Sequence, residues 1–408
     1  MFRLAFAIFA GNVLGIPVYG NFSLGYYYLN IRIGSERQLQ SLILDTGSSL
    51  TITVCSGCRE CARHSNRPYN YTASSSATKP SEDLPFFISY EEGSFYRGHF
   101  VADFVFLEGE TRPLWKVIGC ADEELGKLRF QPADGVMGIG AAAHLQAGTP
   151  PNLIEESVSQ GLTQRNRFFL CLGHNGGRLS LRDWNSKVHL SGTKQVIQSS
   201  KQLFETQYGV LVAGVFVGGQ RVEYDVSRLT LGALPPCFDT GSTVVQFPEA
   251  LLNATMDRLS SFCAGSLERC ARQSRFSFCF DRPTWMPERE FLHSFPSLEF
   301  DFSSARLAWK PENYFFQLVS NRYCVLWDIG SDLVFGAPVM KNLDFMFDRE
   351  KFQIGFVEAK CAEESIDRFV DDFPDSKWTR EKVRNWIKGT SKKWWVYRPN
   401  VPAEEEKR

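Results

Sequence analysis

The 408-residue sequence predicts an all-β protein made of two related lobes, with a few short helices. Three observations lead to this prediction. A short motif occurs once in each half of the chain, segments with alternating apolar and polar residues are common, and few segments have the periodicity of a helix. Two copies of one lobe that face each other about a pseudo-twofold axis would explain the repeat.

The repeated motif is an apolar strand that continues into Asp-Thr-Gly and a hydroxyl residue. It spans residues 42–49 (LILDTGSS) and returns at residues 237–243 (CFDTGST). At nearly equal intervals after the two copies, the segments that begin at Asp134 and Asp332 each contain two apolar residues followed by Gly. Each half therefore carries the same pair of elements in the same order.

Strands are predicted on both sides of the first motif copy. Leu29, Ile31 and Ile33 alternate with polar residues, as in a half-buried strand, and residues 34–37 are expected to turn the chain back towards the motif. Residues 210–222, which glycines interrupt, have a similar pattern.

Helices are expected to be few. One is predicted over residues 152–160 and another over residues 248–263, with Pro248 at its first position. The repeat divides the chain into an N-terminal lobe over residues 21–200 and a C-terminal lobe over residues 201–361.

The composition excludes some classes of function. With 43% hydrophobic and 22% charged residues the chain is an ordinary globular protein, and its formal net charge of −1 offers no field to hold nucleic acid. Residues 1–20 fit a short secretory signal, against the alternative of a buried first strand. No later segment approaches the ~20 apolar residues of a transmembrane helix.

Eleven cysteines in an exported chain are expected to form mainly disulfides, with at least one left over. Cys55, Cys58 and Cys61, followed by His64, also permit a zinc site, but disulfides fit an oxidising compartment better. The three sequons at Asn21, Asn70 and Asn253 are compatible with glycosylation there.

The two Asp-Thr-Gly segments indicate acid chemistry. A carboxylate at a strand end can be held in a tight turn whose glycine allows close backbone approach. If the lobes face each other, Asp45 and Asp239 meet, share one proton and can activate a water molecule for peptide hydrolysis. One such motif is more often a structural turn, whereas two matched copies favour catalysis. The residues expected to support the pair are Thr46, Gly47, Ser48, Thr240, Gly241 and Ser242.

On these motifs the sequence resembles the pepsin-like aspartic protease family, from about Gly25 to Cys361. The resemblance implies Asp45 and Asp239 as the catalytic pair, with Thr46 and Thr240 bracing it. It also implies a flap that covers the substrate and includes Tyr90, Glu91, Glu92, Gly93 and Ser94.

Several features resemble the plasmepsin V and nepenthesin-like branches more than pepsin. They include the cysteine cluster after the first motif and the Ile118-Gly119-Cys120 segment. Ile52 replaces a tryptophan that supports the flap tyrosine in pepsin, so Tyr90 must be positioned in another way. Glu92 lies where plasmepsin V-like flaps also carry Glu, and there an acidic side chain helps to select a basic residue N-terminal to the cleaved bond. The resemblance raises the same hypothesis here, although a charge that is simply solvated at the flap tip is the favoured alternative.

The resemblance also implies disulfide bonds. It pairs Cys279 with Cys324 and Cys171 with Cys361. Cys263 and Cys270 are close enough in sequence to pair, which leaves Cys237 over. The remaining cysteines allow two bridges in three possible pairings, which the sequence does not distinguish: Cys55, Cys58, Cys61 and Cys120.

Residues 362–408 form a tail that is first acidic and then basic and rich in tryptophan. Such a segment can bind a membrane surface or a partner, although docking on the protein's own acidic surface is favoured.

Taken together, these features predict a monomeric aspartic endopeptidase of the secretory pathway that binds a polypeptide between its lobes and needs no cofactor or metal. The alternative is a catalytically inactive binding or inhibitor protein with the same fold.

Overall fold

A computed structural model describes residues 15–21, 24–78, 85–90, 92–141, 149–266, 270–274 and 277–361, without the side chains of residues 262–277. Strands dominate these residues and the helices are mostly short, which confirms the predicted all-β class.

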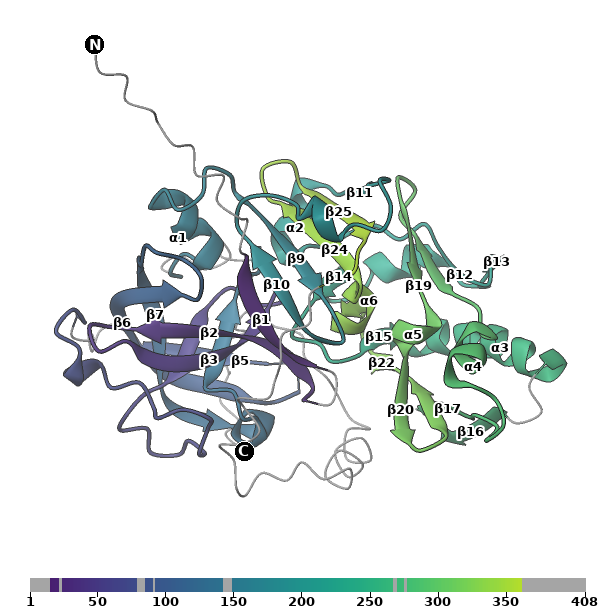
Figure 1. The fold of residues 1–408 in the computed structure, drawn as a ribbon, viewed down its shortest axis with the longest axis horizontal. Coiled ribbons are helices and arrows are strands. Elements are labelled where there is room, and N and C mark those ends of the chain that lie inside the picture. The colour runs from purple at the N-terminus through teal and green to yellow at the C-terminus, as the bar shows by residue number, and fades with distance from the viewer. Residues whose placement is uncertain are drawn as a thin grey trace, which may run out of the picture.

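The largest sheet extends through both halves of the chain. Figure 1 shows the first-half strands on one side, the second-half strands on the other, and β9, β10, β24 and β25 between them. In the described residues the order is β11-β25-β24-β9-β10-β1-β2-β3-β8-β4-β7-β6-β5. The bounds are β1 (Ile16–Asn21), β2 (Tyr26–Ile33), β3 (Gln38–Asp45), β4 (Thr51–Val54), β5 (Pro85–Ser89), β6 (Phe95–Leu107), β7 (Leu114–Leu125), β8 (Gly135–Gly138), β9 (Arg167–Leu172), β10 (Asn175–Ser180), β11 (Gln195–Gln198), β24 (Leu343–Asp348) and β25 (Gln353–Glu358).

Three smaller sheets of four strands each, counted over the described residues, make up most of the second half. The sheet that carries the second Asp-Thr-Gly motif has the order β14-β23-β15-β22; the others are β13-β12-β18-β19 and β16-β17-β21-β20. The bounds are β12 (Gly214–Val217), β13 (Gln220–Arg221), β14 (Cys237–Asp239), β15 (Val245–Pro248), β16 (Cys270–Ser274), β17 (Ser277–Asp281), β18 (Leu298–Asp301), β19 (Arg306–Trp309), β20 (Phe315–Val319), β21 (Arg322–Val325), β22 (Trp327–Gly330) and β23 (Val334–Gly336).

The helix predicted over residues 152–160 is present, and Asn152 caps it together with Glu155 in a capping box. The second predicted helix begins at Glu249, because Pro248 is the last residue of β15. Other helices were not predicted. The bounds are α1 (Leu153–Ser159), α2 (Lys201–Gln207), α3 (Glu249–Ser266), α4 (Glu288–His293), α5 (Pro311–Tyr314) and α6 (Ala337–Met340), with 3-10 turns η1 (Tyr71–Ala73), η2 (Gly126–Phe130), η4 (Ser186–Val188) and η5 (Val226–Thr230).

The first described strand overlaps the segment expected to be a secretory signal. β1 pairs with β10 and β2, and its Ile16 and Val18 side chains are buried. Residues 16–20 are thus part of the sheet, so a leader that is removed would have to end before Ile16 for this strand to remain. Residues 1–14 lie outside the described residues.

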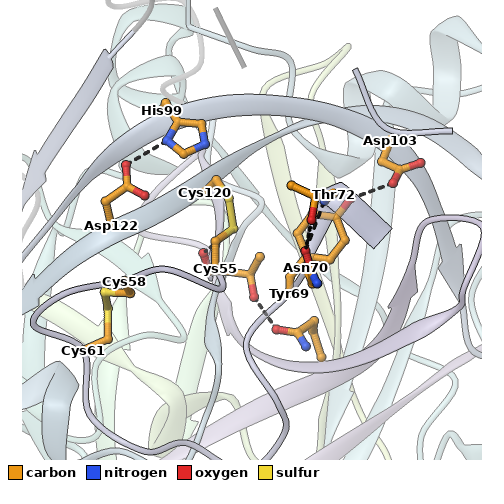
Figure 2. The surroundings of a disulfide bond; sticks show 12 residues. Cys55, Cys58, Cys61, Tyr69, Asn70, Thr72, His99, Asp103, Cys120 and Asp122 are labelled. Atoms are coloured by element: carbon orange, nitrogen blue, oxygen red, sulfur yellow. Dashed lines mark hydrogen bonds and ion pairs between the residues drawn. A yellow bond between two sulfur atoms is a disulfide. The ribbon is translucent and has the colours of Figure 1, made fainter. Parts of the chain in front are cut away.

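The structure shows how the four cysteines pair that the sequence left undecided. Cys55 is bridged to Cys120 and Cys58 to Cys61, and Figure 2 shows the two bonds close together. The zinc alternative is therefore wrong, because these sulfurs are joined to one another. The structure also contains two bridges that the resemblance implied, Cys171–Cys361 and Cys279–Cys324.

Some expectations fall outside the described part of the chain. They include the Cys263–Cys270 bridge, whose side chains are not described, and the tail over residues 362–408. Cys237 is a buried thiol. Within the described residues, no helix has the length and apolar character required to cross a membrane.

Candidate active site

The two motif aspartates end equivalent strands. β3 runs parallel to β8, which places Asp45 beside Gly138. In the second half β14 runs parallel to β23, and Asp239 lies beside Gly336. The repeated pattern of two apolar residues and Gly is thus the strand that neighbours each Asp-Thr-Gly turn.

Sterics explain the glycine at the end of each neighbouring strand. A Cβ atom at Gly138 would lie 2.6 Å from the backbone nitrogen of Leu50, and one at Gly336 would lie 2.1 Å from the carbonyl oxygen of Val244. Both distances are below van der Waals contact, so a side chain would push the motif turn away from the strand.

Each aspartate is held by its own turn. The backbone N–H of Gly47 donates to Asp45 Oδ1 at 2.7 Å, and the Ser48 hydroxyl donates to Asp45 Oδ2. Asp239 receives the same pair of contacts in the second half. There the Gly241 N–H and the Ser242 hydroxyl each donate at 2.8 Å, to Oδ1 and Oδ2.

The two carboxyl groups also lie against each other. A Cβ atom built on Gly241 would be 2.7 Å from Asp45 Oδ1, and one built on Gly47 would be 2.6 Å from Asp239 Cγ. The side chains of Asp45 and Asp239 are hydrogen-bonded to one another. The glycine of each turn therefore provides the space that the opposite carboxyl group occupies.

The environment favours one proton on the pair. Both aspartates are only 6% exposed. Burial raises the pKa of Asp239 well above the ordinary aspartate range, and the charge of Asp45 and the hydrogen bond to it act in the same direction. Ser242 and the Gly241 N–H lower this pKa but do not offset the increase. At mildly acidic pH the pair is thus expected to keep one proton.

Two threonines join the turns reciprocally. The Thr46 hydroxyl accepts from the Thr240 N–H at 2.9 Å and donates to the carbonyl oxygen of Phe238 at 2.9 Å. The Thr240 hydroxyl accepts from the Thr46 N–H at 3.0 Å and donates to the carbonyl oxygen of Leu44 at 2.7 Å. Each half thus completes the hydrogen bonding of the other.

The sequence alone did not identify two further residues that support the turns. Gln207, at the end of α2, donates from Nε2 to the carbonyl oxygen of Gly47 at 3.1 Å. The Thr243 hydroxyl donates to the carbonyl oxygen of Gly25 at 2.5 Å. Both contacts connect the two halves. Thr243 is the last residue of the second motif copy, whereas no local pattern marks Gln207.

The residues expected to form the flap connect β5 to β6. The Tyr90 N–H donates to the carbonyl oxygen of Ser94 at 2.8 Å, and Gly93 turns the chain with a φ of +90°. The Tyr90 ring packs edge-on against Tyr96, 6.3 Å between centroids, in a buried cluster that includes Ile52. The Tyr90 ring is thus held by contacts with Tyr96 and this cluster. Glu91 lies outside the described residues.

His64, the fourth member of the zinc alternative, has another partner. Its Nε2 lies 2.9 Å from a carboxylate oxygen of the buried Glu124, and its Nδ1 lies 3.0 Å from the carbonyl oxygen of Gln131. Across the described residues, no group of three or more His, Cys, Asp or Glu side chains is placed to hold a metal ion.

The chain is similar to one family of known proteins and to several of its individual members. A model of the eukaryotic aspartyl protease family matches residues 26–359. Aspartic protease 5 of Toxoplasma gondii is 23% identical over 88% of this chain. Aspartic proteinase 39 of Arabidopsis thaliana is 23% identical over 83%, and plasmepsin V of Plasmodium falciparum is 22% identical over 82%.

These relatives are longer than the chain. The alignments span 39% of the Toxoplasma protein, 75% of the Arabidopsis protein and 71% of plasmepsin V.

Proposed function

Because this chain belongs to the eukaryotic aspartyl protease family, we propose that it is an aspartic endopeptidase that hydrolyses peptide bonds in polypeptide substrates. The family predicted from the two Asp-Thr-Gly motifs is thereby confirmed, and plasmepsin V is among the relatives, as the cysteine cluster suggested. The catalytic assignment of Asp45 and Asp239 is our inference.

The observation that carries the proposal is the mutual contact of the two carboxyl groups. Two acids that hydrogen-bond each other in a buried site form a pair in which one member can accept a proton while the other donates one. A purely structural turn has no need to bring its carboxyl group against a second one.

In the proposed reaction Asp45 is the base and Asp239 the acid. Asp45 accepts a proton from a water molecule whose oxygen attacks the peptide carbonyl carbon, while the proton of Asp239 passes to the carbonyl oxygen. The products of this step are a tetrahedral diol and a pair that still holds one proton. Asp45 then gives its proton to the amide nitrogen while Asp239 accepts a proton from a hydroxyl of the diol. The carbon–nitrogen bond breaks, the products are a carboxylic acid and an amine, and the pair returns to its starting protonation.

The test is proteolysis of a peptide library by the full chain across acidic and neutral pH, with and without a statine-type transition-state mimic. We expect cleavage that the mimic inhibits, and no detectable cleavage by Asp45→Asn or Asp239→Asn. Circular dichroism should show that both variants keep the fold of the parent protein. Conserved cleavage in both variants would overturn the assignment.

A folded parent protein that cleaves no peptide at any pH, yet binds the mimic or a polypeptide, would instead support the alternative of an inactive binding or inhibitor protein. The two aspartates and their supporting hydrogen bonds are intact, so no observation favours that alternative.

We further propose that the protein folds in the secretory pathway. The support is the four disulfides among the described residues, which persist in oxidising compartments. The sequon at Asn70 is accessible for a glycan, because the Thr72 hydroxyl donates to the Asn70 side-chain oxygen at 2.7 Å on the surface (Figure 2). In the sequon at Asn253, by contrast, Thr255 is buried and donates to Leu251 inside α3.

Expression in a eukaryotic secretory host tests this location. We expect a glycan at Asn70 that peptide mapping detects and that Asn70→Gln removes. Secretion of folded protein with an unmodified Asn70 would contradict the glycosylation, and failure of the disulfides to form there would contradict the compartment.

A further inference from the structure

A lysine lies directly against the flap turn. The backbone N–H of Lys127, at the start of η2, donates to the Ser94 hydroxyl oxygen at 2.8 Å. A Cβ atom on Gly126 would lie 2.4 Å from that same oxygen, and Gly126 has a φ of +76°. Only glycine fits here, so the turn and the lysine are held in close contact.

Ser94 also connects Lys127 to the flap carboxylate. Ser94 is fully buried, and its hydroxyl and backbone N–H both lower the pKa of the Glu92 carboxyl group. One oxygen of Glu92, Oε1, is buried and has no hydrogen-bond partner in the part of the chain that the structure describes. This carboxylate therefore lies in a poorly solvated position, where a nearby cation has a strong effect.

Lys127 supplies that cation and shares it with the second half of the chain. Its Nζ atom is buried, and the charge of Lys127 interacts with the carboxylates of Glu92 and of Asp328 in β22. Burial lowers the pKa of Lys127, and the two carboxylates oppose that change. Burial also raises the pKa of Glu92, which Ser94 and the charge of Lys127 counteract.

We propose that Lys127 is a specificity-determining residue that neutralises Glu92 and so prevents the flap from selecting substrates with a basic side chain. The inference rests on the proposed endopeptidase function. A basic substrate side chain that approaches Glu92 must compete with an ammonium group that is already in place.

Removal of the Lys127 charge should create a preference for substrates with a basic side chain. Without Lys127, Glu92 would lose a positive charge that now interacts with it, and a substrate cation could take that place. The variant protein should therefore prefer a basic residue where the parent protein does not.

The experiment measures kcat/KM for a set of peptides with one cleavage site. Arg, Ala or Glu is placed in turn at each of the four positions N-terminal to the cleaved bond. For the parent protein we expect Arg and Ala peptides to be cleaved at rates within about twofold of each other. For Lys127→Met the Arg-to-Ala ratio should increase about tenfold at one position, as expected for a partly buried charge pair.

Three further variants separate charge from structure. Lys127→Arg keeps the charge and should keep the parent ratio. Arg129→Met removes an exposed charge from the same turn, η2, and should also leave the ratio unchanged. Addition of Glu92→Gln to Lys127→Met should abolish the new preference for Arg.

An unchanged Arg-to-Ala ratio in Lys127→Met at all four positions would overturn the inference. So would a parent protein that already favours Arg tenfold through Glu92. Either result leaves the endopeptidase assignment intact, because that assignment fails only if the parent protein cleaves none of the peptides or if cleavage survives in both Asp45→Asn and Asp239→Asn.

Discussion

At the scale of single residues, the hydroxyl groups of Thr46 and Thr240 are the clearest link between the two motif copies. Each accepts a hydrogen bond from the backbone of the opposite turn and donates one to the strand before the opposite aspartate. Both side chains are buried, so water cannot replace a lost partner.

Replacement of the Thr46 hydroxyl should therefore be costly. Thr46→Val keeps the shape of the side chain but leaves the Thr240 N–H and the Phe238 carbonyl without a partner. We expect the free energy of unfolding to decrease by about 3 kcal/mol, measured by urea denaturation. Thr46→Ser keeps the oxygen and is the control, with an expected loss of about 1 kcal/mol. Equal losses in the two variants would show that the hydroxyl contributes little.

The protonation of Asp239 should appear in the pH dependence of stability. The pKa of Asp239 is raised in the folded protein. At pH values between the ordinary aspartate pKa and this raised pKa, the folded protein therefore keeps a proton on Asp239 that the unfolded chain has lost. The contribution of this group is full at low pH and declines as pH rises through that window.

Asp239→Asn does not titrate and should lack this decline. Relative to the parent protein, the free energy of unfolding of the variant should increase as pH rises above about 4, by at most about 1.4 kcal/mol per pH unit. Urea denaturation of both proteins at a series of pH values provides the measurement. A difference that is constant with pH would mean that Asp239 has an ordinary pKa in the folded protein.

At the scale of elements, the two neighbouring disulfides constrain very different lengths of chain. Cys55–Cys120 joins residues 65 positions apart, whereas Cys58–Cys61 joins residues 3 positions apart. In the chain-entropy description, a bridge stabilises the fold more when it closes a longer loop.

We therefore expect unequal effects when each bridge is replaced by two alanines. Removal of Cys55–Cys120 should lower the free energy of unfolding by about 4 kcal/mol, and removal of Cys58–Cys61 by about 1.5 kcal/mol. Chemical denaturation under non-reducing conditions gives both values. A larger effect for the short loop would mean that local packing, and not loop closure, governs the stability of this region.

Local sequence patterns explain which elements could be predicted. The alternation at Leu29, Ile31 and Ile33 matches β2, in which these three side chains are buried. Pro248 was assigned to a helix because its ring suits a first helical turn, but in the structure it is the last residue of β15 and α3 starts one residue later. The pairing of Cys55 with Cys120 depends on the position of β4 beside β7, which cysteine spacing does not reveal.

The candidate site was predictable to a similar degree. The repeat of Asp-Thr-Gly identified Asp45 and Asp239 because both copies are local and nearly identical. The sequence does not predict the roles of Gln207 and Lys127, because their contacts arise only from the tertiary fold. Gln207 reaches a carbonyl group 160 positions away, and Lys127 interacts with flap and second-half carboxylates.

At the scale of the whole molecule, the central sheet contains strands from both halves of the chain. β24 lies between β9 and β25, with Phe345 opposite Leu170 and Phe356. A buried apolar cluster extends through residues of both halves, from Ile16 to Phe356. The predicted boundary at residue 200 therefore separates segments of the sequence that pack together.

Because both halves share this sheet, we expect the protein to unfold in a single step. Differential scanning calorimetry of the full chain should show one transition, with van't Hoff and calorimetric enthalpies in agreement. Asp45→Asn lacks only one ionisable group and should give the same single peak at a shifted temperature. Two resolved transitions would mean that each half is stable without the other.

The bond between Cys171 and Cys361 encloses 190 positions of the sequence. One cut in the backbone anywhere between these cysteines would leave the pieces covalently attached. A nicked molecule would then migrate as intact on a non-reducing gel, and only a thiol reagent would release the fragments.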